Sequence, residues 1–170
     1  MGGVRAIYAI QRRYVGDVSW DESWNILVDC QGAVRIPCRG SFESVAQVDE
    51  NTGSTYYLDT LSVTPEPGRQ ENSVSAGILQ AELASMGPDD LVIVVEMWGE
   101  DRFVMGYGFA DKDHTINSYP VFFGGGQYVS GTEKTDANGQ SFTLTSVHPL
   151  MAANGWFDNP EDAVVNPSSD

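Results

Sequence analysis

The chain has 170 residues, of which 24 are acidic and 9 are basic, so its formal net charge is -15. A surface with this excess of negative charge has no basic stripe to neutralise phosphates, which argues against nucleic-acid binding. The hydrophobic fraction of 41% is enough for one buried core, and no stretch approaches the roughly 20 apolar residues of a membrane-spanning helix. With no secretion signal apparent, we expect one domain that folds in a cytoplasm.

The first third of the chain predicts a series of strands. Three segments are rich in β-branched and aromatic residues, which is typical of strands: Val4–Ile10, Phe42–Val48 and Tyr56–Val63. Asp17–Ser23 is polar and acidic around a tryptophan, so we expect a loop there. Asp49–Thr55 is expected to be the turn between the second and third of these strands.

Two further segments, Trp24–Asp29 and Ala33–Cys38, are predicted to pair as a hairpin around a turn at Gln31-Gly32. In that register Cys30 and Cys38 lie about five residues apart along the ladder, on the order of 16 Å. This distance is too long for a disulfide, so we expect two free thiols that fill space as small apolar groups.

One segment, Asn72–Met86, has the pattern of a helix. Its apolar residues recur with helical spacing, and Gly87-Pro88 follows as a stop signal. Glu82 falls within the apolar stripe and Gly77 weakens the helix, so the amphipathic face is imperfect.

The second half of the chain predicts strands again. They are Leu91–Trp98 and Arg102–Phe109 as a hairpin, Ile116–Phe123 and Gln127–Ser130 on either side of Gly124–Gly126, and Gln140–Val147 after the turn dipeptide Asn138-Gly139. The whole pattern predicts a mainly β fold, an antiparallel β-sandwich or barrel with one packed α-helix. We expect a single β-rich domain over residues 1–150 and an exposed acidic arm over residues 151–170.

The sequence gives little support for a catalytic or metal site. The two histidines, His114 and His148, are expected at the surface or at a strand edge, and no nucleophile elbow is present. Asp111, Asp113 and His114 are crowded but are expected to form a charged turn. The segment Asp136–Gly139 resembles a fragment of a calcium loop, but its twelfth position is Val147 where a glutamate is required. We therefore predict no catalytic, cofactor-binding or metal-ligating residues and no enzyme.

Two other patterns have simple structural explanations. Gly124–Gly126 lacks the lysine and the following helix of a phosphate-binding loop, so a bend or loop tip is expected. Six aromatic residues could form a sugar-stacking platform, although aromatic residues on sheets are more often core or interface residues. They are Tyr56, Tyr57, Trp98, Tyr107, Tyr119 and Tyr128.

The order of elements over about residues 55–150 resembles the tail-tube and neck proteins of tailed phages. Strands that begin at Tyr56-Tyr57 are followed by one helix, the apolar strand Leu91–Val95, a hairpin that ends in Met105–Gly108, and the segment Ser130–Ser146. The resemblance implies a β-sandwich with one helix whose copies assemble into rings around the path of DNA. It carries over no individual functional residue.

The sequence therefore predicts a virion structural protein, a ring- or tube-forming subunit of a phage tail or neck with an acidic DNA conduit. Its expected partners are copies of itself and neighbouring tail or neck proteins; DNA passes without specific binding, and no membrane is involved. Assembly would occur in the host cytoplasm, and polar arms that include Trp20 and Trp24 would contact neighbours. The alternative is a β-sandwich binding module, for example for carbohydrate.

Overall fold

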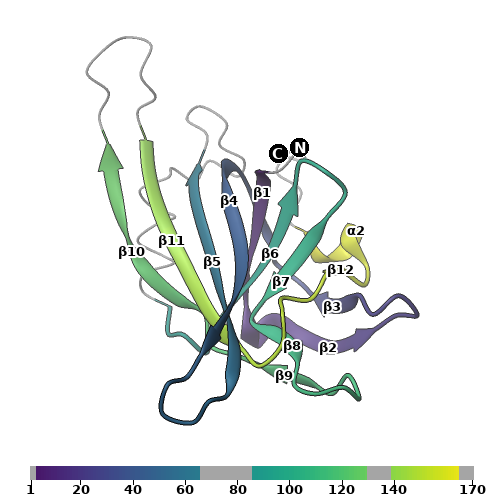
Figure 1. Ribbon diagram of the computed structural model, residues 1–170. Helices are drawn as coiled ribbons and strands as arrows, with labels where there is room; N and C mark the ends of the chain where they lie inside the picture. The colour runs from purple at the N-terminus through teal and green to yellow at the C-terminus, as the bar shows by residue number, and fades with distance from the viewer. Residues whose placement is uncertain (1–2, 66–85, 130–138, 165–170) are drawn as a thin grey trace.

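The computed structural model describes residues 3–65, 86–129 and 139–164, which form three sheets, a 3-10 turn and one short helix (Figure 1). The helical elements are η1 (Arg12–Tyr14) and α2 (Pro160–Ala163). The strands are β1 (Val4–Gln11), β2 (Val15–Trp20), β3 (Ile26–Cys30), β4 (Val34–Val48), β5 (Thr55–Pro65), β6 (Leu91–Met97), β7 (Arg102–Met105), β8 (Tyr107–Phe109), β9 (Ile116–Ser118), β10 (Phe122–Val129), β11 (Gly139–His148) and β12 (Gly155–Phe157).

The largest sheet has the strand order β10-β11-β5-β4-β1-β6-β7, the second has the order β12-β3-β2, and β8 pairs with β9. Within the described residues β12 runs parallel to β3, and the other paired strands are antiparallel. The predicted mainly β fold with antiparallel sheets is therefore confirmed.

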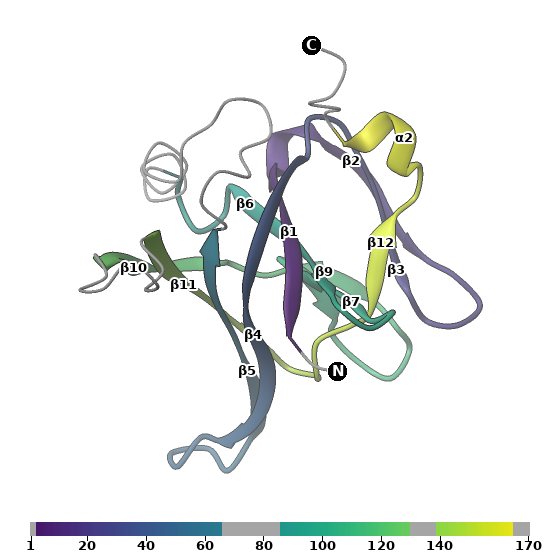
Figure 2. The same cartoon turned by 90° about the horizontal axis from the view of Figure 1, so that it is seen from above.

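Strands β1 and β6 lie in the middle of the molecule and are buried on both faces (Figure 2). On one face, they meet the curved part of the large sheet formed by β4, β5 and β11, and on the other they meet β2, β3 and β12. Side chains alternate between the two faces of a strand, so both sets of alternating positions must be apolar when both faces are covered. This double burial explains the uninterrupted apolar run Leu91–Val95.

Two apolar clusters fill the spaces on either side of β1 and β6. The main core consists of Val4, Ile7, Ala9, Ile36, Cys38, Leu61, Val63, Leu91, Ile93, Val95, Met105, Val121, Phe142 and Leu144. The second core consists of Tyr8, Ile10, Ile26, Val28, Cys30, Ala33, Val92, Val94, Val104, Ala153, Phe157 and Ala163.

Arg12 fastens the corner at which several strands meet. Its guanidinium donates hydrogen bonds to the backbone carbonyls of Asp89, Leu91, Gly106 and Tyr119 at 2.6 to 3.3 Å. These carbonyls belong to three segments that are distant from Arg12 in the sequence, so one planar guanidinium links all three to the end of β1.

The predicted hairpin of Trp24–Asp29 with Ala33–Cys38 is wrong. Strand β3 pairs with β2 and β12, whereas β4 pairs with β1 and β5, so the two segments lie in different sheets. The expected loop at Asp17–Ser23 instead begins within strand β2, whose Val18 pairs with Val28 and packs against the second core. The chain crosses from the second core to the main core between β3 and β4, and this crossing has no local sequence signature.

Neither cysteine is in a disulfide, as predicted, but the reason differs from the one expected. Cys30 belongs to the second core and Cys38 to the main core. The central strands therefore separate the two thiols, and both are buried among apolar neighbours.

At two places the observed strand boundaries differ from the predicted ones, and each difference occurs at glycine residues. The expected strand Arg102–Phe109 divides at Gly106, which has a φ of +110°, and β7 and β8 enter different sheets. The run Gly124–Gly126 does not separate two strands but lies inside β10, where the register with β11 shifts between Phe123 and Gly126. A bulge of this kind bends a strand without ending it.

The expected acidic arm over residues 151–170 is wrong as far as residue 164. Ala153, Phe157 and Ala163 are buried in the second core, and β12 pairs with β3. The high acidic and proline content had suggested an exposed tail, but three well-spaced apolar side chains are enough to attach the segment. Residues 165–170 lie outside the described part of the chain.

The predicted helix Asn72–Met86 lies outside the described residues except for Met86, which is packed against the main core. The turn segment at residues 130–138, including Asp136 and Asn138, also lies outside them. In the parts of the chain that are described, no helix has the length and apolar character needed to cross a membrane.

Candidate functional site

The two histidines have opposite environments. His114 is partly exposed at the tip of the β8–β9 hairpin, in the charged turn that was expected there. The prediction of a surface or edge position for His148 is wrong, because its side chain is only 1% exposed and β11 lies between β10 and β5. The burial of His148 brings it next to two other buried polar groups.

Asp59, Ser146 and His148 form a buried polar cluster at one end of the main core. Asp59 and Ser146 are directly opposite each other on β5 and β11, and all three side chains are at most 1% exposed. His148 Nε2 lies 2.9 Å from Ser146 Oγ and 3.6 Å from Asp59 Oδ2. The composition is that of a hydrolase triad, so its hydrogen bonding decides whether it can act as one.

The hydrogen bonds of this cluster do not activate a nucleophile. Ser146 Oγ donates to the carbonyl of Pro120 at 2.7 Å, so it must accept a hydrogen bond from His148 Nε2. A triad requires the reverse, with Nε2 accepting the serine proton and Nδ1 donating to the aspartate. Here Nδ1 has no partner and faces Gly108, where a Cβ atom would approach it within 2.7 Å. The hydrogen bonding of this buried cluster therefore differs from that of a catalytic triad.

Burial shifts both titratable groups of the cluster toward their neutral forms. Removal from water raises the pKa of Asp59 to about 6. Removal from water also lowers the pKa of His148 to about 4. Tyr119 stacks on the imidazole with 4.7 Å between the ring centroids and shields it from solvent.

The crowded residues Asp111, Asp113 and His114 do not assemble a metal site. Asp111 Oδ1 accepts hydrogen bonds from the backbone N–H groups of Asp113 and Thr115, so the carboxylate organises the turn. Among the described residues there is no group of three or more potential metal ligands.

Three of the six aromatic residues considered as a sugar-stacking platform have other side chains packed over their rings. Tyr119 stacks on His148, the guanidinium of Arg12 lies over the ring of Tyr107, and Arg5 lies over Trp98. Tyr128 is in a part of β10 whose side chains are not described.

A different group of aromatic side chains does gather at the surface. Trp20 and Trp24, on the β2–β3 hairpin, have ring centroids 4.8 Å apart, and each is almost half exposed. The imidazole of His114 stacks on Trp24 with centroids 3.5 Å apart and an angle of 8° between the rings. Phe109 contacts the other side of this group, edge-on to His114. We call Trp20, Trp24 and His114 the aromatic platform.

Two hairpin loops of the same conformation hold the platform. In the first loop Asp21 Oδ1 accepts hydrogen bonds from the N–H groups of Ser23 and Asn25, and in the second Asp111 bonds the equivalent positions. The third residue after each aspartate, Trp24 in the first loop and His114 in the second, has a φ of 62°. This left-handed conformation is uncommon for bulky residues and costs on the order of 1–3 kcal/mol.

The aspartates that brace these loops stay ionised to lower pH than usual. Hydrogen bonds from Asn25 lower the pKa of Asp21, and hydrogen bonds from Thr115 lower that of Asp111. Glu22 and Asp113 are exposed in the same two loops, whereas Lys112 is the one cation among residues 20–25 and 109–115. Four carboxylates and one ammonium group give the loops a net charge of -3.

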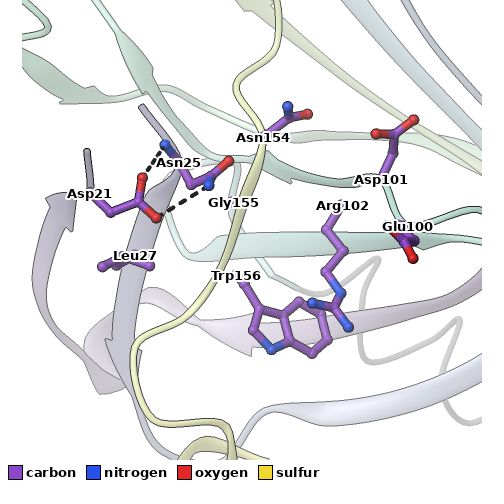
Figure 3. A pocket seen from close by; sticks show the side chains of 9 residues that line it. All are labelled: Asp21, Asn25, Leu27, Glu100, Asp101, Arg102, Asn154, Gly155 and Trp156. Carbon is purple, nitrogen blue, oxygen red and sulfur yellow. Dashed lines mark hydrogen bonds between the residues drawn. The ribbon is translucent and has the colours of Figure 1, made fainter. Parts of the chain in front are cut away.

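A groove of about 370 Å³ opens on the flank of the β2–β3 loop, between β12 and the β6–β7 turn (Figure 3). Asp21, Glu100 and Asp101 contribute carboxylates to it. The ring of Trp156 is covered by the guanidinium of Arg102 at 3.9 Å, and Arg102 also pairs with Glu96 at 3.8 Å. The groove therefore has no open aromatic face, in contrast to the platform.

Sequence reasoning placed Trp20 and Trp24 in a polar arm and did not connect them with His114. The signal that could have found the platform is a repeated pattern, an aspartate followed at the fourth position by asparagine or threonine, in Asp21–Asn25 and Asp111–Thr115. Aspartate at this spacing often caps a turn.

No protein-family model matches the chain, and neither do the curated proteins or the solved structures with which we compared it.

Proposed function

We propose that the chain is a virion structural protein, a subunit that assembles with its own copies into a ring or tube of a phage tail or neck. In this role it is not an enzyme, and its other partners are neighbouring tail or neck proteins. The wall of the assembly is acidic, so DNA passes through it without being bound.

The observation that carries this proposal is an exposed apolar row on the outer face of the large sheet. Val45 and Val147 both pair with Leu58, so the three side chains lie side by side across β4, β5 and β11. Val45 is 41% and Val147 45% exposed. A row of aliphatic side chains on the face of a sheet loses contact with water when a second copy covers it, which favours association.

The β4–β5 hairpin extends this surface away from the body of the molecule (Figure 1). Val48 is strongly exposed near its tip, and an open hollow of about 780 Å³ lies between Val48, Tyr56 and Val147. A projecting hairpin with apolar side chains can reach over a neighbouring subunit, and head-to-tail contacts of this kind close into rings.

The distribution of charge supports a conduit. Among the described residues, Asp59 is the one buried carboxylate, and the others lie mostly in turns and at strand ends. A ring of such subunits presents carboxylates from several turns to its surroundings. Repulsion between these carboxylates and phosphates opposes adhesion of DNA.

The test is the mass of the purified protein in solution, measured by light scattering over a range of protein concentrations. We expect a species many times 18.5 kDa, or growth toward one as concentration rises. The double variant Val45→Thr/Val147→Thr keeps the side-chain shape and the strand preference but removes the apolar row. It should need about tenfold more protein to reach the same mass.

Met151→Thr is the control, since Met151 is an apolar residue outside the apolar row that is even more exposed than Val45 and Val147. It should assemble like the unmodified chain. A strict monomer at every concentration would overturn the proposal and favour the alternative, a β-sandwich binding module. Unchanged assembly of the double variant would exclude the outer face as the contact.

A further inference from the structure

We propose that the aromatic platform is a docking site for an arginine-bearing, basic segment of a partner protein. The inference goes beyond ring assembly and does not depend on it. The site consists of the platform residues Trp20, Trp24 and His114 and the two acidic loops that hold them.

The chain itself places guanidinium groups over tryptophan rings. It has four tryptophans, and two of them lie under guanidinium groups, Trp98 under Arg5 at 5.2 Å and Trp156 under Arg102 at 3.9 Å. The other two, Trp20 and Trp24, contact each other and His114 and are 44% and 46% exposed, and no guanidinium of the described residues lies over their rings. A guanidinium from another protein would complete the same arrangement, because an arginine gains most over the face of an indole ring.

The charge around the platform favours a cationic occupant. Its two loops carry a net charge of -3, and Glu22 and Asp113 are exposed in these loops. The low pKa of Asp21 and of Asp111 keeps these carboxylates ionised as well. A guanidinium can stack on an indole and bind a carboxylate at the same time, which lysine does less well because its charge is a point and not a plane.

The same charge argues against other ligands that stack on aromatic rings. A nucleotide strand would bring its phosphates against four carboxylates. A second copy of this chain is a poor source of the basic segment, since the chain has only 9 basic residues, and Arg5, Arg12, Arg13 and Arg102 already lie over aromatic rings. A partner of different sequence with clustered arginines fits best.

The platform is also prepared for binding before a partner arrives. Trp24 and His114 are fixed by hydrogen-bonded loops and by their parallel stacking, so little side-chain freedom remains to be lost. Tryptophan and arginine are the residue types most enriched among the few that dominate binding at protein interfaces.

The experiment measures binding of three short peptides that differ at two positions only, Gly-Ser-X-Gly-X-Ser-Gly with X as arginine, lysine or citrulline. Tryptophan fluorescence and calorimetry report binding to the full chain. We expect the arginine peptide to bind most tightly, the lysine peptide more weakly and the neutral citrulline peptide weakest, with affinity for arginine falling as salt is added.

Variants locate the site. Trp24→Asn removes the indole but retains a residue that tolerates the left-handed backbone, and Trp20→Ala removes the second ring. Each should weaken binding of the arginine peptide by about tenfold. Trp24→Phe should restore most of the affinity. Trp98→Ala is the control. It removes another exposed indole, but one over which the guanidinium of Arg5 already lies, so binding should be unchanged.

Three results would overturn the proposal. One is equal affinity for the arginine and citrulline peptides, which would exclude recognition of charge. Another is unaltered binding by both platform variants, which would place the peptide elsewhere on the acidic surface. The third is tighter, salt-independent binding of a neutral probe such as maltohexaose at the same tryptophans, which would make the platform a carbohydrate site.

Discussion

The buried cluster of Asp59, Ser146 and His148 is retained in the core although two of its three members are titratable. Its carboxylate oxygens and His148 Nδ1 have no hydrogen-bond partner in the described structure. Burial of unpaired polar groups costs free energy of folding, and the cost is largest when the group is charged. The protonation state of Asp59 should therefore control how much this cluster destabilises the fold.

Replacement of Asp59 by Asn should stabilise the protein at neutral pH but not under acidic conditions. The carboxyl has a pKa of about 6 in the folded state and 3.8 as its ordinary value, so the folded state holds the proton more tightly. As pH rises from 3.8 through 6, the original chain therefore loses stability. A difference of about two units between the two pKa values corresponds to a loss of about 3 kcal/mol in the free energy of unfolding. Asparagine resembles the neutral acid and avoids this loss.

The measurement is urea unfolding of both chains at pH 5 and at pH 7.5, on the alkaline side of the isoelectric point near 4.2. The stability of Asp59→Asn relative to the original chain should increase with pH.

His148 has the opposite effect on the pH dependence of stability, because its lowered pKa destabilises the fold as pH falls from 6.5 through 4. The variant should therefore lose stability more steeply in acid than the original chain. Asp101→Asn, at an exposed turn, serves as control, and an advantage independent of pH would contradict the argument.

At the scale of elements, the bend of β4 joins the two parts of the large sheet. The strand pairs with β1 through Val34–Pro37 and with β5 from Cys38 to Val48. At Gly40, close to the change of partner, a Cβ atom would overlap the backbone carbonyl of Ser62 on β5. Only a residue without a side chain allows the two backbones to approach this closely.

Gly40→Ala should therefore destabilise the fold by about 3 kcal/mol or more, because backbone atoms on β5 cannot move aside without breaking the ladder. Gly53→Ala is the matched control. Gly53 has a φ of +72° in the hairpin turn, but no atom lies within 4 Å of its added Cβ, so only about 1–2 kcal/mol of backbone strain is expected. The difference is measured by denaturant unfolding of the two variants, and equal losses would show that β4 can shift.

Local patterns predicted the elements well but not their partners. The runs Val4–Ile10, Tyr56–Val63 and Gln140–Val147 are strands because β-branched and aromatic residues fill them, which a sequence shows directly. Strand β12 has only three residues, too few for a periodic pattern, and is stabilised by contacts with distant segments. Assignment of β3 and β4 to one hairpin failed because the shortest connection was preferred over the one that buries both cores.

The same limit applies to the candidate sites. The burial of His148 depends on packing by Tyr119, which lies between β9 and β10, and nothing next to His148 in the sequence indicates it. The platform joins Trp24 and His114, which are 90 positions apart in the chain. Sequence reasoning could recognise each loop as a polar turn, but their contact follows from the way β2–β3 and β8–β9 lie on the second core.

At the scale of the whole molecule, the net charge of -15 opposes every contact between copies of the chain. Apolar contact on the outer face must overcome this repulsion for a ring to form. Raising the ionic strength from about 0.05 M to about 0.5 M shortens the screening length from about 14 Å to about 4 Å. Salt should therefore promote assembly of the chain with itself, whereas it should weaken docking of a basic peptide at the platform.

Light scattering at one fixed protein concentration, in low and in high sodium chloride, checks this expectation. The average mass should be larger in high salt. The variant Glu43→Gln/Glu50→Gln removes two exposed charges, one on the outer face beside Val45 and one at the hairpin tip, so it should assemble at lower salt than the original chain. If the mass falls as salt is added, ion pairs rather than apolar contact hold the copies together, and the outer face is not their main interface. Opposite responses to salt in the two assays would establish that the chain uses separate surfaces for its own copies and for a basic partner.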